Sequence, residues 1–253
     1  MEFTIAGFLI ILARLSGLFL SAPIFSSRMM PGQVKIVLVV ALAGMMAYFL
    51  PVASGVVIAN PLYMMAAMVL EILVGYTIGL VAYMLFAGIQ TAGQLIDMQM
   101  GFAIVNVVDP QSGTQIPLMG NLTQTIALLF YLAVNGHHYL LQAVAQSYQV
   151  IPILGLKLGE GFYQSLFSIG AEMFVIALKI AAPLVAAILI TDVAMGFIAR
   201  TVPQMNVFIV GLPLKILIGL GCLLVILPVY LWVFELLFFR FFGYVDGILA
   251  LMR

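Results

Sequence analysis

The residue types that most often do chemistry in enzymes are scarce in this chain. It has two histidines, His137 and His138, and one cysteine, Cys222. Adjacent residues do not face the same side of a helix, so the histidines do not form a metal-binding pair. The sequence contains no HExxH, GxxxxGK[ST] or GxSxG motif. A single cysteine excludes an intrachain disulfide and a cysteine metal site. We therefore predict that the protein is not an enzyme and has no catalytic residue, cofactor or metal.

Ionisable residues within or at the edges of apolar runs form a second group. They are Arg14, Glu71, Glu172, Lys179, Asp192, Lys215 and Glu235. Each costs about 2.5–3.5 kcal/mol at the centre of a bilayer on insertion scales, so each should face protein or water. Ion pairs and hydrogen bonds between helices are the simpler interpretation. A proton relay would need these groups along one pathway, which the sequence does not show.

The least apolar stretch is "GQLIDMQMGFAIVNVVDPQSGTQIP", residues 93–117. On a helix, Gln90, Gln94, Asp97 and Gly101 follow at i, i+4, i+7 and i+11 and form one polar stripe. Unpaired polar groups facing acyl chains cost several kcal/mol, so the stripe should face a lumen or another subunit.

A loop is predicted directly after this stripe. Pro110 disfavours the helical conformation at Asp109, and the next residues form turns. Asn121 is then expected to cap the following helix, with Gln124 in the reciprocal position. An ordinary exposed connection between helices is the alternative. The loop comprises Asn106, Val107, Val108, Asp109, Pro110, Gln111, Ser112, Gly113, Thr114, Gln115, Ile116 and Pro117.

The composition indicates what must position these residues. Of 253 residues, 65% are hydrophobic and 7% are charged, with a mean hydropathy of +1.27. A soluble domain would have about a quarter charged residues. The chain therefore belongs in a membrane or in a large assembly that replaces lipid with protein. Nine basic and nine acidic residues give no basic patch for nucleic acid.

Helix-breaking residues divide the chain into apolar runs, and we predict about six spans from them. Two runs are too long for a bilayer. Within 206–239, Pro213 and Pro228 favour a bent or hairpinned pair over one straight helix. The run from 62 to 105 must also bend or leave the bilayer, and its Gly75 and Gly79 form a small-xxx-small surface for close helix packing. The runs are 3–25, 34–50, 62–105, 118–134, 139–151, 162–198 and 207–239.

Four motifs together resemble the FliR family of type III export-gate subunits, in the same order and over nearly the whole chain. They are "ARLSGLFLSAPIF" (13–25), "GQLIDMQMGFAIVNVVDP" (93–110), "NGHHYLL" (135–141) and "PQMNVFIVGLPLKI" (203–216). The resemblance implies an all-α membrane-associated protein of kinked helical hairpins packed in a helical hetero-oligomer. It also implies a FliP-like part, about 1–200, and a FliQ-like part, about 201–253.

The resemblance further implies the partners. One copy would assemble with FliP and FliQ inside the MS ring of the flagellar basal body, at the bacterial inner membrane and largely above the plane of the lipid. FlhB, FlhA and unfolded export substrates would contact this gate. The loop from Asn106 to Pro117 would plug the closed pore. A virulence-system paralogue is the nearer alternative, and a secondary transporter is the more distant one.

Charges and breakers that need neighbours are predicted to lie at subunit interfaces. Gln204 and Asn206 could instead line the pore. The predicted interface residues are Arg14, Glu71, Gly75, Gly79, Arg200, Pro203, Gln204, Asn206 and Lys215.

Overall fold

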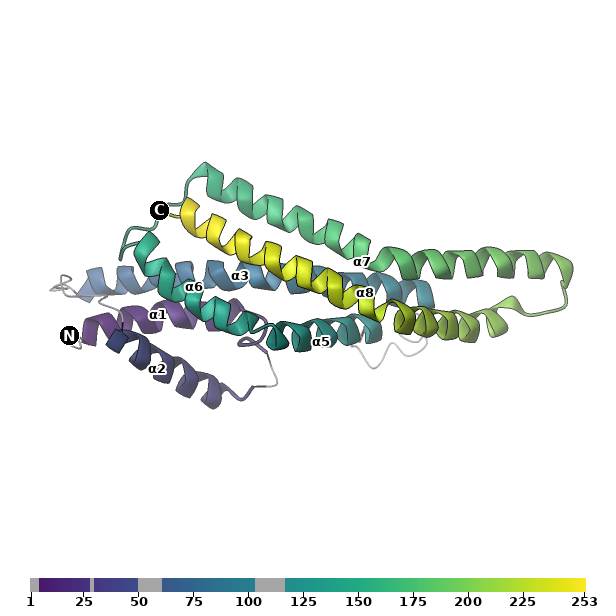
Figure 1. Cartoon of the computed structure of the whole chain (residues 1–253), viewed down its shortest axis with the longest axis horizontal. Helices are drawn as coiled ribbons and strands as arrows, with labels where there is room; N and C mark the ends of the chain where they lie inside the picture. Colours follow the sequence, from purple (N-terminus) through teal and green to yellow (C-terminus); the bar gives the residue numbers. More distant parts are fainter. Residues whose placement is uncertain (1–4, 28–29, 50–60, 103–116) are drawn as a thin grey trace. The chain divides into compact units, whose positions relative to one another are not determined.

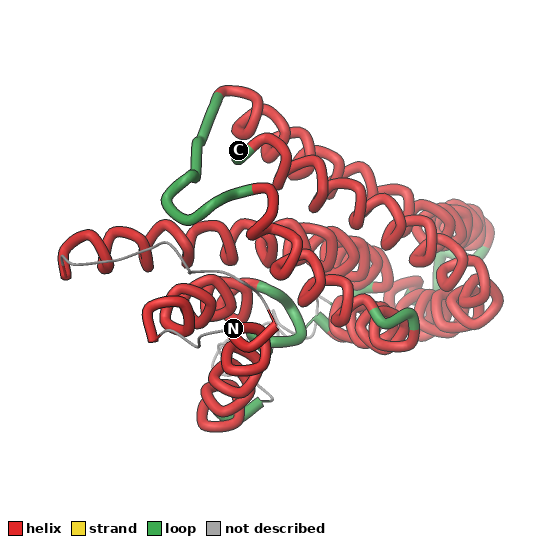
Figure 2. The backbone as a smooth tube through the Cα atoms, turned by 60° about the vertical axis from the view of Figure 1, so that its left-hand side comes forward, coloured by secondary structure: helices red, strands yellow, loops and turns green. Residues whose placement is uncertain are grey.

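A computed structural model describes residues 5–27, 30–49, 61–102 and 117–253 of the chain. These residues form helices and connecting loops without any strand, as Figure 2 shows by colour, which confirms the predicted all-α class. Each helix follows one of the predicted apolar runs. In chain order (Figure 1) they are α1 (Ile5–Ser21), α2 (Gly32–Phe49), α3 (Pro61–Met100), α5 (Leu118–Ala133), α6 (Gly136–Val150), α7 (Glu160–Thr201) and α8 (Val207–Leu251).

The chain divides into two contact units, and the three long helices α3, α7 and α8 contribute to both. The first unit comprises residues 1–85, 131–170 and 238–253, and the second comprises 86–130 and 171–237. The expected boundary near residue 200 lies at the end of α7 and does not coincide with any boundary between these two units. The assignment of FliP-like and FliQ-like parts therefore stays a prediction.

Of the bent or hairpinned pair predicted within residues 206–239, the hairpin is wrong, and a bend stays a prediction. α8 is one helix of 45 residues that contains both Pro213 and Pro228. A proline removes one backbone donor, but ending the helix in apolar surroundings would leave several backbone groups unpaired. Continuing the helix is therefore the less costly arrangement.

Three helices in the structure are longer than the thickness of a bilayer. α3, α7 and α8 have 40, 42 and 45 residues. At roughly 1.5 Å per residue each is about 60 Å or longer, twice a hydrocarbon core of about 30 Å. Four described helices are long and apolar enough to span a membrane, or up to five if α5 and α6, bent by 65°, count as one span. That is fewer than the predicted six, because α1, with 17 residues, is too short for the same criterion.

Within the first unit, α1 and α3 touch through their backbones. A Cβ atom added to Gly75 would overlap the carbonyl oxygen of Arg14, and one added to Gly79 would overlap the hydroxyl of Ser21. The Ser21 hydroxyl also donates a hydrogen bond to the carbonyl oxygen of Tyr76 at 2.9 Å. The close approach that the glycine pair predicts is therefore present, and the helix it admits is α1 of the same chain.

The substitution Gly75→Ala should destabilise the first unit. Its methyl group meets backbone that cannot rotate away, and overpacking of this kind costs about 1–3 kcal/mol. Thermal unfolding in detergent measures the effect. Gly44→Ala in α2 is the matched control, because an added Cβ there meets nothing within 4 Å. Equal melting temperatures for the two variants would contradict the backbone contact.

Candidate functional site

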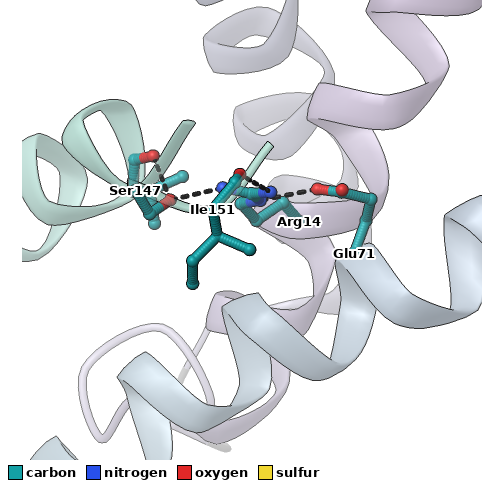
Figure 3. Close-up of polar contacts among 5 residues, drawn as sticks. Arg14, Glu71, Ser147 and Ile151 are labelled. Carbon is teal, nitrogen blue, oxygen red and sulfur yellow. Dashed lines mark hydrogen bonds and ion pairs between the residues drawn. The ribbon is translucent and has the colours of Figure 1, made fainter. Parts of the chain in front are cut away.

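Arg14 is the centre of a buried polar cluster in the first unit. Its guanidinium donates to Glu71 Oε2 at 2.6 Å, to Ser147 Oγ at 2.7 Å and to the carbonyl oxygen of Ile151 at 3.3 Å. It also lies 3.7 Å from the centroid of the Tyr148 ring. Figure 3 shows Arg14 between Glu71 of α3 on one side and Ser147 and Ile151 on the other. One side chain from α1 thus connects α1, α3 and α6.

Burial sets the electrostatics of this cluster. Arg14 and Ser147 are 0% exposed and Glu71 is 1% exposed. A buried charge without a partner is costly, and here the ion pair and the hydrogen bonds supply partners. The sequence predicts a subunit interface for Arg14 and Glu71 because their charges need neighbours. In the structure those neighbours belong to the same chain, and neither residue has an exposed surface to offer a partner. No local signal points to Ser147 or Tyr148, which sequence reasoning missed.

The remaining predicted interface residues lie around the turn between α7 and α8 and on α8. Arg200, Pro203, Gln204 and Asn206 are exposed. Lys215 of α8 forms an ion pair with Asp192 of α7, with Nζ 2.5 Å from Oδ1. Their side chains are 23% and 37% exposed, so a second protein could still contact the pair. An interface role for these residues stays a prediction.

The predicted polar stripe on α3 is split in the structure. Gln90 and Gln94 are half-buried, and a lumen or interface role for them stays a prediction. Asp97 is only 6% exposed, and its carboxylate accepts hydrogen bonds from the backbone N–H groups of Met119 and Gly120. Asp97 thus caps α5, which begins at Leu118. The predicted cap Asn121 is wrong, because it lies inside the first turn of α5.

Gly101 ends the helix rather than extending the stripe. Its φ is 84°, in the left-handed region that glycine adopts at low cost. The N–H of Gly101 bonds to the carbonyl oxygen of Met98, and that of Phe102 bonds to the carbonyl oxygen of Asp97. This is the two-bond motif that closes many helices. Of the predicted loop, only Pro117 is described, half-buried before α5, and residues 106–116 lie outside the described part.

The histidine pair begins α6 at its first turn. The ring centroids of His137 and His138 are 4.1 Å apart. Within the described ranges, no group of three or more histidine, cysteine, aspartate or glutamate side chains could hold a metal ion.

Comparison with known proteins gives one consistent match along the chain. The family described as bacterial export proteins, family 1, matches residues 5–241. A flagellar biosynthetic protein FliR from Bacillus subtilis (strain 168) is 42% identical over 236 residues, covering 88% of this chain and 86% of the relative. FliR of Escherichia coli (strain K12) is 30% identical over 239 residues, covering 94% and 91%. FliR of Aquifex aeolicus (strain VF5) is 28% identical over 215 residues, covering 85% and 83%.

Removing one partner of the buried ion pair should unfold the first unit more readily. Arg14→Met leaves Glu71 charged, buried and unpaired, a change that typically costs about 3–5 kcal/mol. The double variant Arg14→Met with Glu71→Met should recover most of this loss, because neither charge then remains. Thermal unfolding of the purified chain in detergent measures both.

The exposed pair provides the control for this prediction. Lys215→Met breaks the partly exposed ion pair with Asp192, and such pairs contribute about 0.2–1 kcal/mol. A loss for Arg14→Met no greater than that for Lys215→Met would contradict the central role of Arg14.

Proposed function

The chain belongs to family 1 of the bacterial export proteins, and we propose that it is a subunit of the flagellar type III protein-export gate. The observation that carries this proposal is the 42% identity to a FliR protein over 88% of the chain. The FliR proteins named above come from three different bacteria and are all flagellar, which favours the flagellar system over the virulence paralogue. α3, α7 and α8 each run unbroken, whereas transporter sites use discontinuous helices. A secondary transporter is therefore the weaker alternative.

We further propose that the subunit assembles with FliP and FliQ, one copy to each gate. The exposed surface of the second unit supports this step. Large apolar side chains that are 59–78% exposed cover α7 and α8 there. Lys179 and Glu235 are exposed on the same helices. Those apolar side chains are Phe174, Leu178, Val193 and Phe197 on α7, and Leu217, Leu224, Val225 and Trp232 on α8.

The combination of apolar and charged side chains favours protein over lipid as the neighbour of this surface. An apolar patch of this extent marks an interaction surface. Lipid would cover the apolar groups but would penalise an exposed lysine or glutamate by about 2.5–3.5 kcal/mol. A protein partner can cover both. We therefore place the subunit among FliP and FliQ at the inner membrane, within the MS ring and next to FlhA and FlhB.

In this role the subunit helps to form a conduit for unfolded flagellar proteins and needs no catalytic residue. The conduit must accept chains of any sequence, so it must exclude ions and water without recognising a substrate. A movable segment next to an apolar constriction provides that, because narrow apolar pores resist water and ions. We assign the plug to residues Asn106–Pro117, and Gln90 and Gln94 to the polar wall of the conduit.

Deletion of residues 110–115 should raise ion conductance through assembled gates at rest. The deleted residues lie between α3 and α5, so the helices and the assembly with FliP and FliQ should be retained. Conductance of gates reconstituted in lipid bilayers measures the leak, and co-purification measures assembly. A Gly-Ser segment of equal length at 110–115 is the control that separates length from side-chain character. Unchanged conductance after the deletion would contradict the plug.

A charge swap tests whether the pair of Lys215 and Asp192 contacts a partner. Lys215→Asp alone places a second carboxylate next to that of Asp192. The repulsion should destabilise the contact between α7 and α8 and weaken the assembly. Adding Asp192→Lys restores an internal ion pair, but it reverses the polarity that a partner meets. The double variant should therefore keep the stability of the chain and still co-purify less well with FliP and FliQ.

Lys157→Glu, an exposed lysine outside α7 and α8, is the control for the swap. Full recovery of co-purification in the double variant would show that the pair is internal only, and would remove Lys215 from the proposed interface.

A further inference from the structure

The side chains of α2 are apolar on every side of the helix, and most of them are exposed. Residues 36–49 include no charged or amide side chain. Within α2 only Val39 and Ala43, one turn apart, are buried, and the helix packs on α1 (Figure 1). Val37 and Met45 are 66% and 61% exposed. The chain itself therefore covers only a narrow stripe of α2.

The length of α2 and the polar groups at its ends match a bilayer. Its 18 residues rise about 27 Å, close to the thickness of a hydrocarbon core of about 30 Å. Gln33 and Lys35 lie in the first turn, and the hydroxyl of Tyr48 lies in the last. A lysine near the end of a span can reach the phosphates of the headgroups, and tyrosine is enriched at the same depth. The polarity along α2 therefore complements that of a bilayer.

A protein partner would fit this surface less well than lipid. Protein interfaces contain about one hydrogen bond per 100–200 Å². The side chains of residues 36–47 can form no strong hydrogen bond, and the backbone of a helix is already bonded internally. On α7 and α8, by contrast, acyl chains would penalise the exposed Lys179 and Glu235. The criterion that favours protein around α7 and α8 thus favours lipid around α2.

We propose that α2 is a lipid-contacting helix of this subunit, in which acyl chains of bilayer phospholipids cover the exposed side and Lys35 binds the phosphates of their headgroups. The inference goes beyond the proposed function, because it requires only a membrane around the chain and not an export gate. A helix of this length places Lys35 and Tyr48 at the two boundaries of the hydrocarbon core, since a mismatch in length is costly. α2 therefore sets the depth of the subunit in the bilayer.

A photoreactive side chain identifies the neighbour of α2 directly. In two separate variants of the full chain, p-benzoylphenylalanine replaces Val37 of α2 or Leu178 of α7, which are 66% and 62% exposed. Each variant is assembled with FliP and FliQ in vesicles of phosphatidylethanolamine and phosphatidylglycerol. Illumination should give a phospholipid adduct at Val37, detected by mass spectrometry, and a cross-link to FliP or FliQ at Leu178. A protein cross-link at Val37, or no lipid adduct there, would overturn the inference.

The two probes separate this inference from the proposed function. Lipid adducts at both positions would remove the proposed protein partners of α7 and leave the lipid contact of α2 standing. Protein cross-links at both positions would have the opposite meaning. A lipid adduct at Leu178 alone would contradict both.

Lysine substitutions along α2 test its depth independently. Val40 is exposed near the middle of the helix, and Tyr48 is exposed in its last turn. Val40→Lys should lower the recovery of assembled gates from membranes about tenfold or more, because a charge is costly at the centre of a bilayer. Tyr48→Lys, at the boundary, and the matched control Val40→Leu should leave the recovery nearly unchanged. Equal recovery of the two lysine variants would overturn the lipid contact, since a protein partner imposes no such dependence on depth.

Discussion

The buried guanidinium of Arg14 is the interaction on which the first unit depends. It is 0% exposed, and its partners come from α3, from α6 and from the residue that follows α6. Moving any of these elements away would remove a hydrogen bond from the buried guanidinium, and a buried charge without its partners costs several kcal/mol. Apolar contacts alone would tolerate small shifts between apolar helices, because the hydrophobic effect has no preferred direction. The directional bonds of Arg14 therefore select one arrangement of α1, α3 and α6.

The second unit follows the same rule with a different partner. Asp97 is also buried, but its carboxylate accepts hydrogen bonds from backbone N–H groups of α5 rather than from a basic side chain. Both buried charges lie next to glycines where backbones touch: Gly75 contacts Arg14, and Gly93 contacts the first turn of α5. Glycine permits the close approach and the charge makes it specific. A chain with only 7% charged residues can in this way define its helix packing with few buried polar groups.

A feature can be predicted from the sequence when the residues that determine it lie close together in the chain. Local patterns predict the helices well, because each apolar run forms the helix itself and the breakers beside it mark where the helix ends. The continuity of α8 through Pro213 and Pro228 escaped prediction, since it depends on the apolar surroundings rather than on the proline itself. The partners of Arg14 lie 57, 133 and 137 residues away, and the cap of α5 lies 22 residues before Met119. No periodicity carries such pairings, and the local pattern therefore points to the nearer Asn121 as the cap.

The exposed faces of α7 and α8 connect this packing to assembly. Burial inside the chain satisfies Arg14, Glu71 and Asp97, but it leaves Lys179 and Glu235 exposed among large apolar side chains. In lipid these two charges together would cost about 5–7 kcal/mol on insertion scales. In water the apolar side chains around them would remain uncovered, which favours association. A surface that suits neither solvent is most stable against other protein, and helices of about 60 Å extend beyond the hydrocarbon core in any case. The charges that the chain leaves exposed therefore support the proposed place inside an assembly.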